Sequence, residues 1–379
     1  MKFDLKKINF LKKDSEPDSS GKKKLSLQKK ILICLGAVVC VIVILLASVY
    51  GVFLHYYNKM NITSIDDNYD IVTAIDYEEG DIKEDELTDE ERQKLDELVE
   101  GNGDYTAMDV EGRNVTNILL LGTDSRKKGN VRSRTDSMVI LSIDKETNRI
   151  IMTSVMRDTY VSIPKVGKNR LNAAFVFGGP KLLFDTIEYN FGIHLDKYVQ
   201  IDFFNFVDMV NAVGGVDIDL TTEEIKVINK SYLPSINKSV GKKKSGKYID
   251  PKKPGLHHLN GAQALAYSRI RYVGNADFGR TERQRKVLTE IIKKARKMSV
   301  SELNQFADVV LPLVSTNLSQ SEVMGLLLNA KEYLDYEIVS GRMPIDGSYK
   351  YLTIRGASVL GVDFSPNSQY WYELVYGKK

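Results

Sequence analysis

One uninterrupted apolar run dominates the hydrophobic pattern near the start of the chain. Residues 31–54 read ILICLGAVVCVIVILLASVYGVFL and contain no charged side chain. At a rise of about 1.5 Å per residue, a helix of this length spans the ~30 Å hydrocarbon core of a bilayer. The pattern therefore predicts a single transmembrane helix, and we expect it to be retained because a cleaved signal peptide has a shorter apolar region.

The charges flanking this run predict its orientation. Residues 1–30 contain ten lysines against four acidic residues, and the positive-inside rule makes such a segment a cytoplasmic tail. Everything after residue 54 is then outside, which excludes nucleic acid as a partner of the exported part. Both cysteines, Cys34 and Cys40, lie within the apolar run, so no disulfide is expected beyond it.

Composition divides the exported region into two parts. Residues 55–112 contain nineteen acidic residues against four basic ones, and their apolar residues are sparse. This pattern predicts an extended, acidic, extracytoplasmic stalk that acts as a spacer. Residues 113–379 are basic overall and long enough for one large domain.

The periodicity of apolar residues after position 113 predicts a mixed α/β domain. Strands are expected at 117–121, 137–143, 149–154, 198–201 and 215–220, with a closing strand at 351–354. Helices are expected at 171–190, 203–213, 261–269, 281–298, 301–313 and 321–333. Because these elements do not alternate strictly, we expect a mixed central sheet with helices on both faces rather than a regular doubly wound fold.

A polar, lysine-rich insertion is expected over residues 221–254. It contains the runs 242–244 and 252–253, which consist entirely of lysine. Two interpretations remain open at this point. The insertion either contacts anionic lipid headgroups or wall polymer, or it is a solvated loop.

Two aspartates follow or begin predicted strands. Asp124 comes just after the strand that ends near Gly122, and Asp136 stands twelve residues later, where the next strand starts. If the loop between them folds back, both carboxylates could hold one hard cation such as Mg²⁺, with Mn²⁺ as an alternative. The competing interpretation is that Asp124 caps a turn and Asp136 pairs with Arg134 at the surface.

Arginines accompany these aspartates in the same segments. A guanidinium group suits phosphate because its planar fork donates two hydrogen bonds at once. Each arginine taken alone could be part of a structural salt bridge, but their joint occurrence with two aspartates predicts a site for a pyrophosphate-bearing substrate. The candidate substrate-binding residues are Arg134, Arg157, Arg170, Arg269, Arg271, Arg280 and Gln284.

Seven segments together resemble one known family. NILLLGTDSR, RTDSM, MRDTYVSIP, RLNAAF, GGVDIDL, LNGAQALAYSRIR and DFGRTERQ occur in this order. They are similar to segments of the LytR–CpsA–Psr (LCP) family of bacterial envelope proteins, and the resemblance covers about 113–295. It implies an α–β–α catalytic domain over 113–379 that follows a membrane anchor, in the cell membrane of a Gram-positive bacterium.

The resemblance also implies an activity. An LCP protein of this type would be a magnesium-dependent phosphotransferase that moves a glycopolymer, such as teichoic acid or capsule, from a polyprenyl-pyrophosphate carrier in the membrane lipid to peptidoglycan. Asp124 and Asp136 would hold the metal, and Asp136 or Asp124 would act as the base. The arginines and Gln284 would surround the pyrophosphate, with Arg170 where the family often has lysine. The expected catalytic residues are Asp124, Asp136, Arg134 and Arg157.

The polyprenyl tail implied by this resemblance needs an apolar tunnel. Phe175, Phe177, Phe184 and Phe191 are candidate linings, and core packing is the alternative for them. Two other functions remain open. The same site could hydrolyse the pyrophosphate, with water as the acceptor, or the protein could be a non-catalytic regulator that binds the wall.

Overall fold

A computed structural model of the protein describes residues 50–65, 71–72, 88–90, 93, 113–124, 133–354 and 357–377. The chain divides into two units, 1–56 and 57–379, and the fold described below is that of the second. The predicted cytoplasmic tail, 1–30, and most of the predicted anchor and stalk lie outside the described residues. No helix in the described part of the chain is both long and apolar enough to cross a membrane.

A seven-stranded mixed sheet forms the centre of the domain. Parallel pairing joins β1 to β10, β7 to β2 and β4 to β11, whereas β10–β7, β2–β3 and β3–β4 are antiparallel. This arrangement confirms the predicted mixed sheet. In spatial order the strands are β1 (Asn61–Ile62), β10 (Ser315–Thr316), β7 (Tyr198–Asp202), β2 (Val115–Thr123), β3 (Thr135–Asp144), β4 (Arg149–Val155) and β11 (Glu337–Met343).

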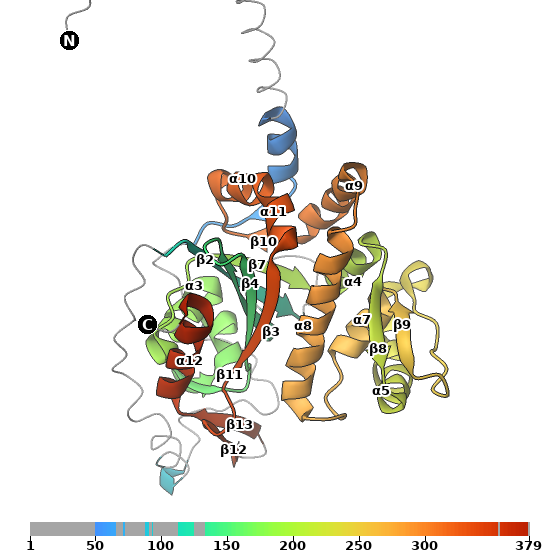
Figure 1. Ribbon diagram of the computed structural model, residues 1–379. Coiled ribbons are helices and arrows are strands. Elements are labelled where there is room, and N and C mark those ends of the chain that lie inside the picture. Colours follow the sequence, from blue (N-terminus) through green and yellow to red (C-terminus); the bar gives the residue numbers. More distant parts are fainter. Residues whose placement is uncertain are drawn as a thin grey trace, which may run out of the picture. The chain divides into compact units, whose positions relative to one another are not determined.

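Helices cover both faces of this sheet, also as predicted (Figure 1). On one face, α3 (Leu171–Phe191) and α12 (Phe364–Tyr376) pack on the side chains of Met138 and Ile140. The next residue of β3, Val139, points to the other face, because successive side chains of a strand alternate. There it joins a cluster that includes residues of α8 (Ala276–Ala295) and α11 (Ala330–Asp335).

A second hydrophobic core lies beside the sheet, around α4 (Phe203–Ala212) and α7 (Gly261–Ser268). The hairpin of β8 (Val216–Leu220) and β9 (Gly255–Leu259) packs here, together with α5 (Thr222–Val227), η3 (Ile228–Tyr232) and α6 (Leu233–Val240). Glu224 completes a capping box with Thr221 at the start of α5.

The solvated-loop interpretation of residues 221–254 is therefore wrong for most of the segment. Its backbone is helical over much of 222–244, ending in η4 (Lys242–Lys244). Ile225, Ile228, Leu233 and Ile236 are buried in the second core, whereas the lysines of 242–244 are exposed. The prediction was based on the lysines, whereas burial of the isoleucines and the leucine between them stabilises the helical structure of the segment.

The C-terminal third agrees with the prediction only in part. Helix α9 (Val300–Val310) and helix α10 (Gln320–Leu328) each begin one residue before the predicted ranges 301–313 and 321–333 and end inside them. The predicted closing strand belongs to β12 (Tyr349–Ile354), which pairs with β13 (Ala357–Val362) in a separate hairpin. The strand at this edge of the sheet is β11, which pairs with β4. Earlier in the chain, β5 (Tyr160–Ile163) and β6 (Gly167–Arg170) form another hairpin that was not predicted.

Candidate active site

A β-bulge places Asp136 at the end of the β2–β3 ladder. Gly122 pairs with Ser137 and Thr123 pairs with Thr135, so Asp136 is the extra residue between them. A bulge of this kind redirects a side chain away from the regular alternation of the strand. The strands approach closely here, since a Cβ on Gly122 would lie 3.0 Å from the Ser137 Cβ.

Asp136 begins a chain of ion pairs that runs through the loop after β4. Its carboxylate accepts a hydrogen bond from Arg157, whose Nε donates to Asp158 at 3.2 Å. Asp158 Oδ1 lies 3.6 Å from Nη1 of Arg170, the residue that precedes α3. Burial opposes ionisation of Asp136, but the charges of Arg157 and Arg280 outweigh it and hold the pKa of Asp136 below its usual value.

A second group of arginines follows α7. Arg269 is the C-cap residue of this helix, and its guanidinium lies 4.8 Å from the ring centre of Phe203 and 3.6 Å from Asp124. Arg271 Nε lies 3.5 Å from Asp277 Oδ1, on the first turn of α8. Asp277 thus holds one arginine of this group in place, and Phe203 and Asp124 hold the other.

Arg280 is the most buried cation of the site. Only 3 % of its surface is exposed, and none of its three nitrogens donates a hydrogen bond to a described residue. Its Nη1 lies 3.0 Å from Asp277 Oδ1 without hydrogen-bond geometry. Burial and the nearby charge of Arg157 lower the pKa of Arg280 to about 10. Such a group would be stabilised by an incoming anion.

These side chains surround a polar pocket of about 300 Å³. Its walls come from β3, η3, the start of α4, the segment after α7, and α8. Three arginines face one carboxylate across it, so the pocket favours an anion. The lining residues are Asp136, Phe203, Ser231, Tyr232, Arg269, Arg271, Tyr272, Arg280 and Gln284.

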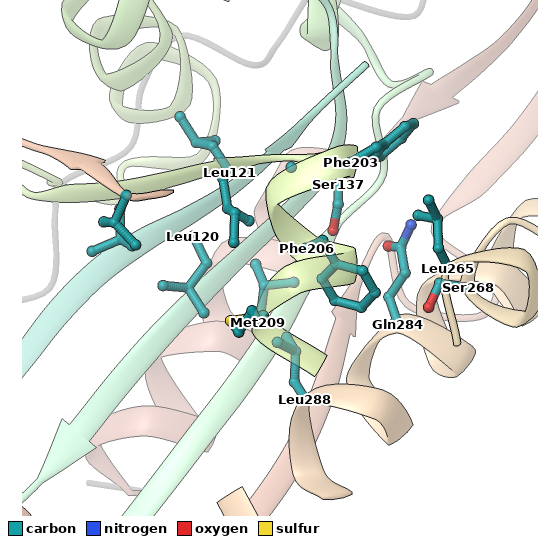
Figure 2. A pocket seen from close by; sticks show the side chains of 15 residues that line it. Leu120, Leu121, Ser137, Phe203, Phe206, Met209, Leu265, Ser268, Gln284 and Leu288 are labelled. Carbon is teal, nitrogen blue, oxygen red and sulfur yellow. The ribbon is translucent and has the colours of Figure 1, made fainter. Parts of the chain in front are cut away.

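An apolar cavity of about 180 Å³ adjoins this pocket, and the two share Phe203 and Gln284. Figure 2 shows Leu120 and Leu121 of the sheet, Phe206 of α4 and Leu288 of α8 around it. The sheet and the helices α4, α7 and α8 therefore surround a space that suits an apolar chain whose end would reach the arginines. The remaining lining residues are Gly122, Ser137, Val139, Val199, Ile201, Met209, Leu265, Ser268 and Val314.

The sequence profile of the LytR_cpsA_psr family matches residues 72–375, which is most of the chain. The chain belongs to the LytR_cpsA_psr family. The resemblance found in the motifs is thereby confirmed, and the match extends beyond the motif core in both directions. At its N-terminal end it enters the predicted stalk, of which Asn61–Ile62 already form β1 at the edge of the sheet.

Individual relatives agree with this LytR_cpsA_psr assignment. Regulatory protein MsrR of Staphylococcus aureus (strain Mu50) is 32% identical over 254 residues, which cover 66% of this chain and 72% of MsrR. Polyisoprenyl-teichoic acid–peptidoglycan teichoic acid transferase TagU of Bacillus cereus is 33% identical over 223 residues, or 58% of this chain and 65% of TagU. The solved structure "TagT bound to LI-WTA" has a TM-score of 0.53 and 25% identity, covering 69% of this chain and 89% of that one.

The four phenylalanines that were candidate linings of an apolar tunnel do not line the apolar cavity of this LytR_cpsA_psr domain. Phe175, Phe177, Phe184 and Phe191 are buried in the core that α3 and α12 form with the sheet. The cavity is instead bounded by α4, α7, α8 and the sheet, and its aromatic linings are Phe203 and Phe206. Core packing was thus the correct interpretation of the four phenylalanines.

The predicted site residues fall into two groups. Those that line the polar pocket are Asp136, Arg269, Arg271, Arg280 and Gln284. Arg157 and Arg170 belong to the ion-pair chain behind Asp136, while Asp124 pairs with Arg269. Arg134 lies just before β3, outside the residues that line the pocket.

Sequence reasoning missed several residues that build the site, among them two aspartates and two phenylalanines. Asp158 and Asp277 hold the arginines, and both stood within quoted motifs as the partner next to or near an arginine. Phe203 and Phe206 line the cavity. Their only signal was the sequence Phe-Phe-Asn-Phe at the start of a helix that directly follows a strand.

Among the described residues, no three metal-ligating side chains gather at one place. Asp124 and Asp136 nonetheless stand at the same end of the β2–β3 ladder, each beside an arginine. Mg²⁺ is commonly held by one or two carboxylates together with substrate phosphates and water. This pair therefore fits a cation that shares its coordination with a phosphorylated substrate, and does not fit a cation held by protein alone.

Proposed function

We propose that this protein transfers a glycopolymer from a polyprenyl-pyrophosphate carrier to peptidoglycan. The observation that carries the proposal is that the two pockets lie side by side. An apolar cavity suited to a lipid tail adjoins a pocket with three arginines, and Phe203 and Gln284 belong to both. A molecule that fills both is an amphiphile with an anionic head, which a polyprenyl pyrophosphate is.

The relatives support this choice of reaction. TagU, at 33% identity, is named a teichoic acid transferase that acts between a polyisoprenyl carrier and peptidoglycan. TagT, at 25% identity, was solved with LI-WTA bound. MsrR is named a regulatory protein, but the three arginines around one pocket of the present chain, of which Arg280 is buried, are more readily explained by a bound phosphate than by a regulatory surface.

In the proposed reaction, a hydroxyl oxygen of the wall attacks the phosphorus that bears the polymer. The bond between this phosphorus and the oxygen of the lipid phosphate breaks, and the lipid phosphate leaves with the electron pair. The hydroxyl proton passes to solvent or to the departing phosphate. Arg269, Arg271 and Arg280 stabilise the charge on the phosphate oxygens, which is the main catalytic demand of phosphoryl transfer.

Asp136 is better suited to positioning than to proton abstraction. Its lowered pKa makes it a weak base, and Arg157 already donates to it. Phosphoryl transfer through a loose transition state requires little help from a strong base. We therefore assign Asp136, with Asp124, to holding Mg²⁺. When bound, this ion would neutralise charge on the pyrophosphate.

The proposed function includes a location. The sequence predicts a single membrane helix at 31–54 and an acidic stalk before the domain. We propose that this anchor keeps the domain at the outer surface of the cell membrane, where lipid-linked polymer and peptidoglycan meet.

The test uses the full chain in nanodiscs with a lipid-linked polymer labelled in its sugars. Label should move to peptidoglycan when acceptor is present. Arg271→Ala should abolish this transfer, whereas Lys286→Ala, at an exposed position of the same helix as Arg280, should not. Release of label at the same rate without acceptor would identify a hydrolase instead. Unchanged transfer in the Arg271→Ala protein would refute the assigned site.

A further inference from the structure

Helix α8 runs past the apolar cavity and then past the polar pocket, so its residues give the order of these two spaces. Leu288 lines the apolar cavity, Gln284 lines both spaces, and Arg280 lines the polar pocket. Asp277, nearly one turn closer to the N-terminus, pairs with Arg280. At about 1.5 Å per residue, the segment from Leu288 to Asp277 spans about 16 Å. A lipid tail, its phosphates and whatever lies beyond them would therefore follow α8 towards its first turn.

The β12–β13 hairpin stands at that first turn (Figure 1). The ring of Phe278 lies 4.9 Å from the ring of Tyr349 and 6.4 Å from that of Tyr351. The backbone of β13 is also bonded to the ion-pair loop, because the Leu360 N–H donates to the Asp158 carbonyl at 2.9 Å. The hairpin is thus fixed at both the α8 side and the Arg157 loop side of the site.

Tyr351 presents an aromatic surface at this position. It is 56% exposed, although its ring packs edge-on against Phe278 and Tyr349. Burial, followed by the nearby Tyr349 and the carboxylate of Asp277, raises the pKa of Tyr351. Like an ordinary tyrosine, it is protonated at neutral pH, so its hydroxyl can donate a hydrogen bond. An aromatic face with a donor at its tip suits a sugar, whose ring has an apolar C–H face and a polar edge.

The direction of the proposed transfer indicates which substrate would supply a sugar at the hairpin. In an in-line displacement the attacking oxygen approaches opposite the leaving oxygen. The leaving lipid phosphate lies on the side of the apolar cavity, so the attacking hydroxyl comes from the side of Asp277 and the hairpin. We infer that Tyr349 and Tyr351 form the platform that holds a sugar ring of the acceptor glycan strand. This inference rests on the function proposed above.

The test measures transfer and binding separately with the full chain in nanodiscs. Tyr351→Ala should lower kcat/KM for the acceptor about twofold to tenfold, the range that an aromatic contact gives. The KM for the lipid-linked donor should not change. Tyr351→Phe, which keeps the ring, should lose less. Tyr189→Ala is the matched control, because Tyr189 is also 56% exposed but lies on α3.

Direct binding of a soluble peptidoglycan glycan fragment, followed by calorimetry, should weaken by a similar factor in Tyr351→Ala. A response equal to that of Tyr189→Ala in both assays overturns the inference. A raised KM for the donor alone also overturns it, because the sugar on the hairpin would then belong to the polymer. If the wild type binds the fragment through Tyr351 but transfers nothing, the platform stands and the proposed transferase function fails.

Discussion

Arg280 and Arg283 are two buried arginines of α8 for which we predict opposite effects on stability. Arg283 donates from Nε to Glu224 Oε1 at 2.8 Å and from Nη2 to the Val273 carbonyl at 2.9 Å. The nitrogens of Arg280 donate to no described residue, although one lies 3.0 Å from Asp277. The two side chains are similarly buried, so pairing is the difference between them.

Keeping Arg280 charged costs folding free energy. Burial and the charge of Arg157 lower its pKa from its usual value to about 10, a change that corresponds to about 3 kcal/mol. Since the folded pKa is the lower one, this destabilisation is present at neutral pH and decreases only as the pH rises through about 10. Arg280→Met removes the charge, and Asp277 keeps Arg271 at 3.5 Å. Without ligand, the variant should be as stable as the wild type or more stable by up to about 3 kcal/mol.

Arg283→Met is the matched comparison. It leaves the buried Glu224 carboxylate without its cation and should destabilise the protein by about 3–5 kcal/mol. Urea unfolding can be followed through the single tryptophan, Trp371, which is buried in the core. A polyprenyl pyrophosphate should raise the unfolding free energy of the wild type and raise that of Arg280→Met far less. If Arg280→Met is destabilised as strongly as Arg283→Met and still responds to ligand, Arg280 is a structural ion pair and the reasoning is refuted.

Two further predictions concern the cavity and the bulge. Met209→Arg should place a charge in the apolar cavity and weaken binding of polyprenyl pyrophosphate more than tenfold, since a buried unpaired charge costs several kcal/mol. Calorimetry measures this affinity, and inorganic pyrophosphate, which should bind unchanged, is the control ligand. Asp136 has a lowered pKa, so its ionisation stabilises the fold above its usual pKa and ceases to do so as the pH falls through the lower, folded value. The stability difference between wild type and Asp136→Asn should hence shrink below pH 3.8, and a difference that stays constant down to pH 2 would contradict it.

Local patterns in the sequence were sufficient to predict those helices and strands whose apolar residues recur regularly on one buried face or on both. The apolar runs of β2, β3 and β4 and the helical periodicity of α3 each identify the element without knowledge of its neighbours. β11 could not be found this way. Its sequence, EIVSGRM, is only partly buried, and it becomes a strand through parallel pairing with β4, nearly two hundred residues earlier.

The same limit applies to the apolar cavity. Both faces of the sheet bury apolar residues, so an aromatic residue in the sequence does not indicate which face contains a space. Phe184 fills the core on the α3 face, whereas Phe203 lines the cavity beyond the other face. Packing density differs between these two environments, and packing is a property of the whole fold.

The motifs identified the charged residues of the site but not how they pair. Arg280 and Arg283 stand three residues apart in the segment DFGRTERQ, and nothing in their spacing distinguishes them. The distinction depends on Glu224, which reaches Arg283 from α5. Asp158 and Asp277 likewise hold arginines that are more distant in the sequence: Asp158 lies 3.6 Å from Arg170, and Asp277 lies 3.5 Å from Arg271.

The pairing also determines how a divalent cation and a pyrophosphate would bind. Asp124 has an arginine nitrogen at 3.6 Å and Asp136 accepts from Arg157, so a cation alone must displace guanidinium groups. A pyrophosphate offers these groups stronger, planar acceptors and thereby releases the carboxylates. Each ligand should strengthen binding of the other by the same factor, as linkage requires. Titration of Mg²⁺ should show weak binding to the ligand-free chain and tighter binding with pyrophosphate present. Equal affinity in both titrations would mean that the arginines do not leave the carboxylates.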